Sequence, residues 1–140
     1  QLIAVVMGAD TRDERNEIAR KLLDMGFANY TVYTEKEQAV ESVPVYGGTV
    51  DCATVYSRPF SAIINKSDLS KISKLYEIPD HITAPASSGQ SVGSIIYEVG
   101  GKRIGKCELY IKESIDDIGV FGLFFRILRA AVMQNAKIDK

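Results

Sequence analysis

The chain has 140 residues, of which 46% are hydrophobic and 25% charged, and its formal net charge is −1. This length fits about one domain, and the composition is typical of a globular protein rather than a disordered tail. The small net charge and the lack of a basic cluster argue against nucleic acid as a partner.

The first predicted element is a strand over Leu2–Met7, an apolar run typical of strands that are buried on both faces. A helix should follow, because Thr11 and Glu14 have the spacing of a capping box, and Gly26 is expected to end it in a left-handed conformation. The apolar face of this helix is predicted from Ile18, Ala19, Leu22, Leu23 and Met25. Since such a strand needs cover on both faces, we expect it to belong to a larger sheet whose other strands lie outside this chain.

Short strands separated by turn residues are predicted from residue 31 onward. Thr31–Thr34 is one β-prone run, and a break at residues 57–59 precedes another at Phe60–Asn65. Residues 43–45 and 49–55 should form two strands joined by a two-residue Gly47–Gly48 turn, since glycine tolerates the positive φ of a type I′ turn. Pro44 places its strand at an edge or a bulge.

A second hairpin is predicted from Ser91–Val99 and Lys102–Glu113 around Gly100–Gly101. In its second strand Cys107, Leu109 and Ile111 alternate with polar residues, which indicates one buried and one wet face. Residues 67–75 fit either a helical turn or a strand, and residues 79–89 form a loop. About six short strands with two glycine turns predict a small antiparallel sandwich or barrel.

The sequence contains few residues in patterns that carry chemistry. It has no Ser-x-x-Lys, Ser-x-Asn or Lys-Thr-Gly motif, no nucleophile elbow and no P-loop, so we predict no catalytic residue, metal or cofactor in these residues. His81 is expected to be incidental, and the lysines of Lys66–Lys74 to form a solvated face. Cys52 and Cys107 lack metal-ligand spacing; they should be half-buried free thiols on strands, with a disulfide as the open alternative.

Arg15 is the one ionic residue that the pattern singles out. It lies in the first turn of the predicted helix, where the helix dipole disfavours a cation. Nearby carboxylates such as Glu14 can offset this cost. Alternatively, the guanidinium faces a carboxylate ligand off the edge of the sheet.

The tail from Ile118 to Met133 is apolar except for Arg126 and Arg129. Its uninterrupted apolar run is shorter than the ~20 residues that span a bilayer, and its narrow basic face favours a helix that lies in the membrane interface. The alternatives are a helix docked on its own domain or a seam between copies. The predicted membrane-contacting residues are Phe121, Leu123, Phe124, Phe125, Arg126, Ile127, Leu128 and Arg129.

These segments together resemble one known family. Residues 2–30 resemble the last strand and closing helix of the penicillin-binding domain of low-molecular-weight penicillin-binding proteins, which are serine-type D-alanyl-D-alanine carboxypeptidases. The matching features are the LIAVVMG strand, Arg15 seven residues after that glycine, and the KLLDMGF helix exit. Ile82–Pro85 followed by Gly89–Ile95 is similar to the family's C-terminal domain, and Gly119–Phe124 is similar to its amphipathic anchor.

The resemblance implies a mainly β fold: a small antiparallel β-sandwich preceded by the last strand and helix of an α/β, β-lactamase-like domain and followed by an amphipathic helix. The implied divisions are residues 1–28, 29–114 and 115–140. Such enzymes remove the terminal D-alanine from peptidoglycan stem peptides through an acyl-enzyme, and their catalytic motifs precede the part matched here. The resemblance places Arg15 near the substrate carboxylate.

By the same resemblance the sandwich is a stalk or interaction module, and the tail anchors it to the outer face of the cytoplasmic membrane. The expected partners are the stem peptide, bound by the missing catalytic domain, the membrane surface, and a protein partner or second copy at the sandwich or tail. The competing reading is a non-catalytic extracytoplasmic β-sandwich that only binds a partner.

Overall fold

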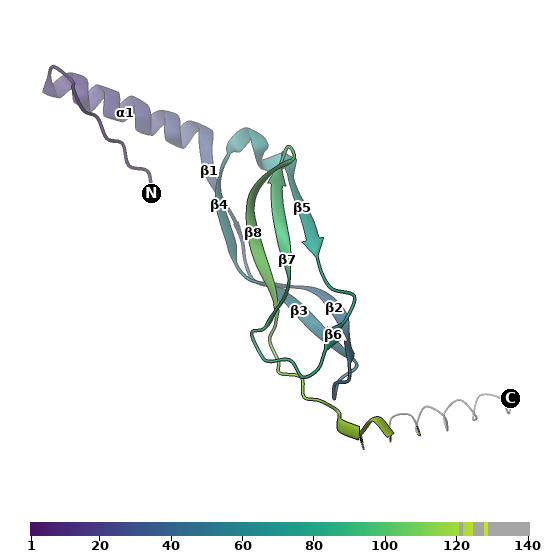
Figure 1. Cartoon of the computed structure of the whole chain (residues 1–140). Coiled ribbons are helices and arrows are strands. Elements are labelled where there is room, and N and C mark those ends of the chain that lie inside the picture. Colours follow the sequence, from purple (N-terminus) through teal and green to yellow (C-terminus); the bar gives the residue numbers. More distant parts are fainter. Residues whose placement is uncertain (121, 125–127, 129–140) are drawn as a thin grey trace.

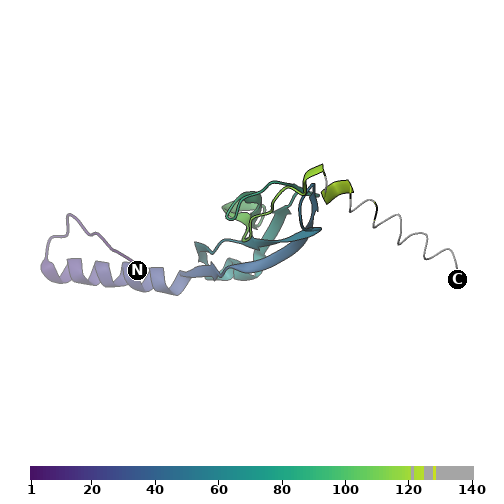
Figure 2. The same cartoon turned by 90° about the horizontal axis from the view of Figure 1, so that it is seen from below.

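A computed structural model of the chain describes residues 1–120, 122–124 and 128. Figures 1 and 2 show an elongated molecule in which one long helix and the described start of the tail lie at opposite ends of a β body. The β body therefore separates the two ends of the chain rather than bringing them together.

Helix α1, Arg12–Asn29, begins where the capping box predicts. The Thr11 hydroxyl accepts from the Glu14 N–H at 3.2 Å, and the Glu14 carboxylate accepts from the Asp10 N–H at 3.3 Å. The predicted end at Gly26 is wrong, because the helix continues for three more residues. Gly26 instead makes room for Leu2: a Cβ at this position would lie 2.9 Å from a methyl carbon of the Leu2 side chain.

Residues 1–11 do not form the predicted strand. Ile3, Val5 and Met7 are 76–89% exposed, as expected of an apolar run that has no sheet to join. A strand buried on both faces needs hydrogen-bonding neighbours and cover, and the described residues supply neither. The α1 face is also uncovered, since no residue of this helix is buried.

No loop separates the helix from the first strand. Strand β1, Tyr30–Glu35, begins at the residue after α1, and the Tyr30 N–H donates to the Gly26 carbonyl. Lys66 also donates from its Nζ to the Phe27 carbonyl at 2.7 Å. Two hydrogen bonds therefore tie the end of the helix to the β body.

The strands form two sheets (Figure 1). In the smaller one, β1 pairs antiparallel with β4, Phe60–Asn65; both strands fall on predicted β-prone runs. The larger has the order β5-β7-β8-β3-β2-β6. Its members are β2 Gln38–Tyr46, β3 Cys52–Ser57, β5 Ile72–Glu77, β6 Ile82–Thr83, β7 Ser91–Val99 and β8 Lys102–Ile111. All neighbours are antiparallel except the short β2–β6 pair.

The β7–β8 hairpin matches its prediction closely. Gly100 and Gly101 both have positive φ, 57° and 80°, as a type I′ turn requires. Along β8 the exposure of Cys107, Leu109 and Ile111 is 0–4%, while the residues between them are more exposed. The period-two pattern therefore identified the buried face of this strand correctly.

The β2–β3 connection differs from its prediction. It spans residues 47–51, and only Gly47 has positive φ, so it is not a two-residue type I′ turn. Gly48 is buried instead, and a Cβ on it would lie 2.6 Å from Val45 and 2.8 Å from Ile115. This glycine is needed for close packing against the segment after β8 rather than for a turn.

Residues 66–77 combine both of the predicted alternatives. A 3-10 helix, η1, covers Lys66–Lys71, and β5 follows directly. The predicted loop over residues 79–89 contains the two-residue β6. The core combines side chains from both sheets, and its fully buried members are Val55, Ile95, Tyr97, Leu109 and Ile111.

Candidate functional site

A cluster of polar side chains is enclosed where the two sheets meet. Glu35, at the end of β1, accepts from the hydroxyls of Tyr33 and Tyr97, the latter at 2.8 Å, and forms an ion pair with Lys74 on β5. The Glu35 side chain is only 17% exposed and that of Lys74 29%. We call these four residues the Glu35 cluster; they tie β1 to β5 and β7.

The electrostatics of the Glu35 cluster keep its carboxylate ionised. Burial acts to raise the pKa of Glu35, but hydrogen bonds from Lys74, Tyr33 and Tyr97 outweigh it, and the net shift lowers this pKa. Burial and then the hydrogen bond to Glu35 raise the pKa of Tyr97. The hydrogen bond that Lys74 donates to Glu35 is the main cause that raises the pKa of Lys74. A neutral phenol and two opposite charges therefore persist at neutral pH.

Aromatic packing holds this cluster in place. The Phe60 ring stacks on the Tyr97 ring with a centroid distance of 4.0 Å and an interplanar angle of 0°. Gly105 lies against the Phe60 ring, since a Cβ at position 105 would be 2.5 Å from a carbon of that ring. Through these contacts the cluster joins the smaller sheet to β5 and β7 of the larger one.

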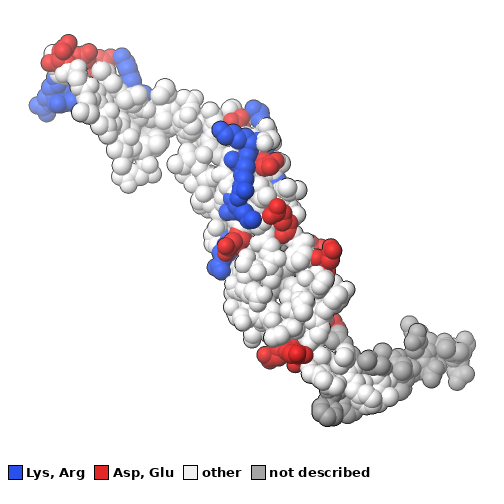
Figure 3. Space-filling model, in the orientation of Figure 1, with Lys and Arg blue, Asp and Glu red and all other residues white. Residues whose placement is uncertain are grey.

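A second, more exposed network lies along β8. The Tyr110 hydroxyl donates to Glu37 at 2.8 Å, and Lys112 forms an ion pair with the same carboxylate. Arg58 pairs with Glu108 at 3.5 Å and lies 4.7 Å from the centre of the Tyr110 ring. Figure 3 shows Lys and Arg gathered in a stripe over this strand with carboxylates beside it. Exposed pairs of this kind contribute little to stability.

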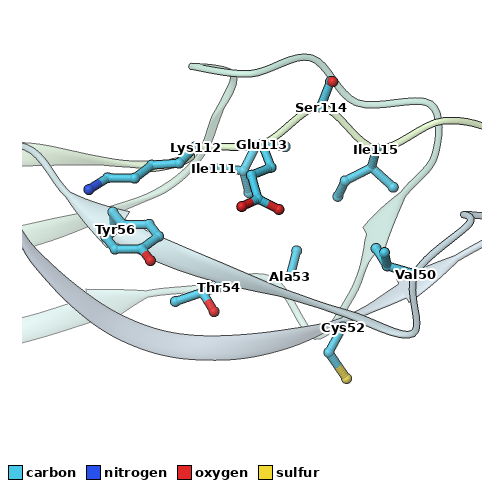
Figure 4. Close-up of a pocket in the computed structure, with 10 residues that line it drawn as sticks. All are labelled: Val50, Cys52, Ala53, Thr54, Tyr56, Ile111, Lys112, Glu113, Ser114 and Ile115. Carbon is cyan, nitrogen blue, oxygen red and sulfur yellow. The ribbon is translucent and has the colours of Figure 1, made fainter.

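A cavity of about 200 Å³ opens between β3 and the segment after β8. Figure 4 shows the Glu113 carboxylate pointing into it, with Ala53 and Ile115 on its walls, while the Cys52 thiol points away. Among the ten described residues that line it, no nucleophile is paired with a base. In residues 1–120, 122–124 and 128, no three His, Cys, Asp or Glu side chains are placed to hold a metal ion.

Arg15 lies exposed on the first turn of α1. In the part of the chain that the structure describes it makes no ion pair, although Asp13 and Glu14 place two carboxylates in the same turn. Its predicted ligand role is not tested by these contacts. The guanidinium is available to a group that this chain does not contain.

The other predicted residues have ordinary structural roles. His81 stacks on Tyr46 at 4.3 Å. Both cysteines are free, but neither is half-buried as predicted: Cys52 is exposed, and Cys107 is buried with its thiol 2.9 Å from the Arg58 carbonyl. The prediction of a solvated lysine face is wrong for Lys74, because Glu35 draws it into the cluster.

The tail is described only in part. Val120, Leu123, Phe124 and Leu128 are 49–84% exposed. The predicted contacts Phe121, Phe125, Arg126, Ile127 and Arg129 lie outside the described residues. Among the residues that are described, no helix is long and apolar enough to cross a membrane.

Comparison with known proteins identifies the domain. Residues 27–117 match the family model of the penicillin-binding protein 5 C-terminal domain. The chain belongs to this family. It is 31% identical over 126 residues to D-alanyl-D-alanine carboxypeptidase DacA of Haemophilus influenzae, covering 87% of this chain and 32% of the relative. It is also 31% identical over 123 residues to D-alanyl-D-alanine carboxypeptidase DacF of Bacillus subtilis, covering 84% and 31%.

A solved structure supports the same assignment. Penicillin-binding protein 5 of Haemophilus influenzae superposes with a TM-score of 0.68 and 27% identity, covering 80% of this chain and 34% of the other. The predicted family and mainly β fold are thus confirmed. The chain spans about a third of the length of the relatives that it matches.

The sequence analysis did not predict the Glu35 cluster. The alternation along β1 places Tyr33 and Glu35 on one side of the strand, and that spacing was the available signal. Lys74 and Tyr97 lie at least 39 positions after Glu35 in the sequence. The pairing of β5 with β7 places these two residues opposite each other in the cluster. No local pattern reports such a contact.

Proposed function

We propose that the chain is the C-terminal portion of a serine-type D-alanyl-D-alanine carboxypeptidase that removes the terminal D-alanine from peptidoglycan stem peptides. The observation that carries this proposal is that the chain matches about a third of the length of relatives whose names state this activity. The acyl-enzyme serine and its lysine would lie in the preceding penicillin-binding domain. This agrees with the lack of Ser-x-x-Lys and Lys-Thr-Gly motifs in the 140 residues.

A fluorescent penicillin tests the assignment directly. The longer protein that contains this chain should become covalently labelled and should release D-alanine from a pentapeptide, whereas the 140 residues alone should not be labelled, because they contain no activated serine. Labelling of these residues that one of their own serine substitutions abolishes would contradict the proposal. So would a longer protein that neither labels nor hydrolyses.

The same proposal gives Arg15 a role on the substrate side of the catalytic cleft. Its exposure and its lack of an ion pair in the described residues leave the guanidinium free to hold a carboxylate. A charge-assisted hydrogen bond contributes about 1.5–3 kcal/mol, so Arg15→Ala in the full-length enzyme should lower kcat/KM by about tenfold or more. Arg20→Ala, which removes another exposed arginine five residues further along α1, is the control; equal kcat/KM in both variants would contradict the role.

We further propose that the β body is a stalk and that the tail lies flat on the outer face of the cytoplasmic membrane. The body holds α1 and the start of the tail at opposite ends (Figures 1 and 2). Leu123, Phe124 and Leu128 present apolar surface to solvent. Full burial of each such side chain stabilises by about 1.5–3 kcal/mol, and less at an interface.

Co-sedimentation with anionic lipid vesicles tests the anchor. The chain should partition into vesicles, and removal of residues 118–140 should abolish this. A double substitution of Leu123 and Phe124 by Glu should weaken it strongly, while Val32→Glu, which charges an exposed apolar site on β1, should leave it unchanged. Equal partitioning with and without the tail would contradict the anchor and favour a docked helix or an oligomer seam.

A further inference from the structure

An open groove lies between β2 and the segment that leaves β5. Gln38–Glu41 face Tyr76 and Ile78 across a space of about 360 Å³. The groove continues for about 240 Å³ where Glu41–Pro44 face Ile78–Asp80. Because Glu41 and Ile78 line both parts, the two spaces form one channel along β2. Strands β2 and β6 lie in the half of the β body that is away from α1 (Figure 1).

The groove is open because β2 has an unpaired edge. On this side only Val45 and Tyr46 pair with β6. The Val45 N–H donates to Asp51 at 2.9 Å, toward β3, so the alternation of an antiparallel ladder directs the backbone groups of Ser42 and Pro44 away from β3. Pro44 has no N–H, and neither has Pro79 on the facing segment, so the two segments cannot form a continuous ladder.

The opposite wall begins with a second free edge. Strand β5 is the outermost strand of its sheet and, among the described residues, pairs only with β7. Through the antiparallel pairs β5–β7, β7–β8, β8–β3 and β3–β2, β5 and β2 run in the same direction. A single antiparallel segment in the groove therefore has the right direction to pair with either edge.

The groove also carries charge without a counter-ion. Glu41 and Asp80 come from opposite walls, and in the described part of the chain neither forms an ion pair. By contrast Glu35, Glu37 and Glu108 all have cationic partners. Val40, Tyr76 and Ile78 add an apolar floor. The lining thus matches a segment with apolar side chains and a lysine or arginine.

We propose that this groove binds an extended peptide segment of another protein by β-strand addition. The segment runs antiparallel along the free edge of β2, its backbone pairs with Ser42, and its basic side chain lies between Glu41 and Asp80. Free edge strands are templates for such pairing. The inference is independent of the carboxypeptidase activity, which the penicillin assay tests separately.

The test is an NMR titration of the full 140-residue chain, labelled with nitrogen-15, with the peptide acetyl-Thr-Val-Thr-Lys-Val-Thr-Val-amide. Saturable shifts should map to Ser42, Tyr76 and their neighbours. Glu41→Gln together with Asp80→Asn should raise Kd by about three- to tenfold, as two exposed ion pairs would. Glu113→Gln removes an unrelated exposed carboxylate from the cavity in Figure 4 and should leave Kd within twofold.

Two peptide variants separate strand addition from other binding. N-methylation of alternate residues removes the donors that a ladder needs and should abolish the shifts, and replacing the lysine by Glu should weaken binding to a similar extent as the double variant. Unchanged amide dispersion shows that each protein variant is folded. Absence of saturable shifts, equal binding of the N-methylated peptide, shifts confined to β1 and β4, or shifts that follow protein concentration without peptide would each overturn the proposal.

Discussion

Replacing Tyr97 by Phe removes one hydroxyl from the centre of the Glu35 cluster. The lost hydrogen bond is 2.8 Å long and ends on an ionised carboxylate, so it should contribute about 1.5–3 kcal/mol to the free energy of unfolding. The ring and its stack on Phe60 are retained, and little volume is lost. Because the matched domain covers residues 27–117, 1 kcal/mol corresponds to about 4–8 °C, and Tm should fall by about 6–24 °C.

The pH dependence of this difference has a definite sign. The pKa of Glu35 is lowered in the folded state, so its contribution is present above the unfolded pKa of about 4.3 and is lost as pH falls through the folded pKa. The gap in stability between wild type and Tyr97→Phe should therefore be full at pH 7 and shrink in acid. At high pH the raised pKa of Tyr97 acts in the opposite direction: its contribution is lost above about pH 10.

Thermal and urea unfolding, followed by circular dichroism, measure the loss of stability in Tyr97→Phe at pH 7 and its decrease at pH 3–4. Tyr30→Phe is the matched control, because Tyr30 is 50% exposed and its hydroxyl has no partner among the hydrogen bonds of the described residues. Loss of an exposed hydroxyl should change stability by no more than about 0.5 kcal/mol. Equal Tm shifts for the two variants, or a gap that does not change with pH, would refute the role of the Glu35 cluster.

Three further variants or probes test other contacts. Gly105→Ala should destabilise the fold by about 1–3 kcal/mol by overpacking against Phe60, while Ser87→Ala at an exposed site should not; equal urea midpoints would contradict this. A thiol reagent should modify Cys52 and spare Cys107 in the native chain, since burial raises the pKa of Cys107; equal rates by mass spectrometry would contradict it. Thr11→Ala should cost about 1 kcal/mol of helix stability through loss of the cap, seen as lower helicity at 222 nm.

Local patterns predicted the elements whose determinants are local. The β7–β8 hairpin follows from two adjacent glycines and an alternating strand, and the start of α1 follows from a capping box four residues long. Strand β4 also begins at the residue after Pro59, as the break predicts. In each case the residues that decide the structure are neighbours in the sequence.

Predictions failed where distant residues decide. The run Leu2–Met7 has the composition of a buried strand, but a strand forms only where partners exist. Gly48 was assigned to a turn, whereas contacts with Val45 and Ile115 determine its place. The groove along β2 depends on Pro44 and Pro79, which the sequence separates by 35 positions and the fold places on facing walls.

Pro44 was predicted at an edge or bulge, and the free edge of β2 confirms it.

The direct passage from α1 into β1 has a mechanical consequence. With no linker between Asn29 and Tyr30, and with Lys66 bonded to the Phe27 carbonyl, rotation about this junction requires breaking hydrogen bonds rather than turning a flexible chain. A domain that packs on α1 would therefore keep a fixed orientation, as well as a fixed distance, relative to the β body. If the tail rests on a surface, that rigidity would restrict the directions in which an attached domain can face.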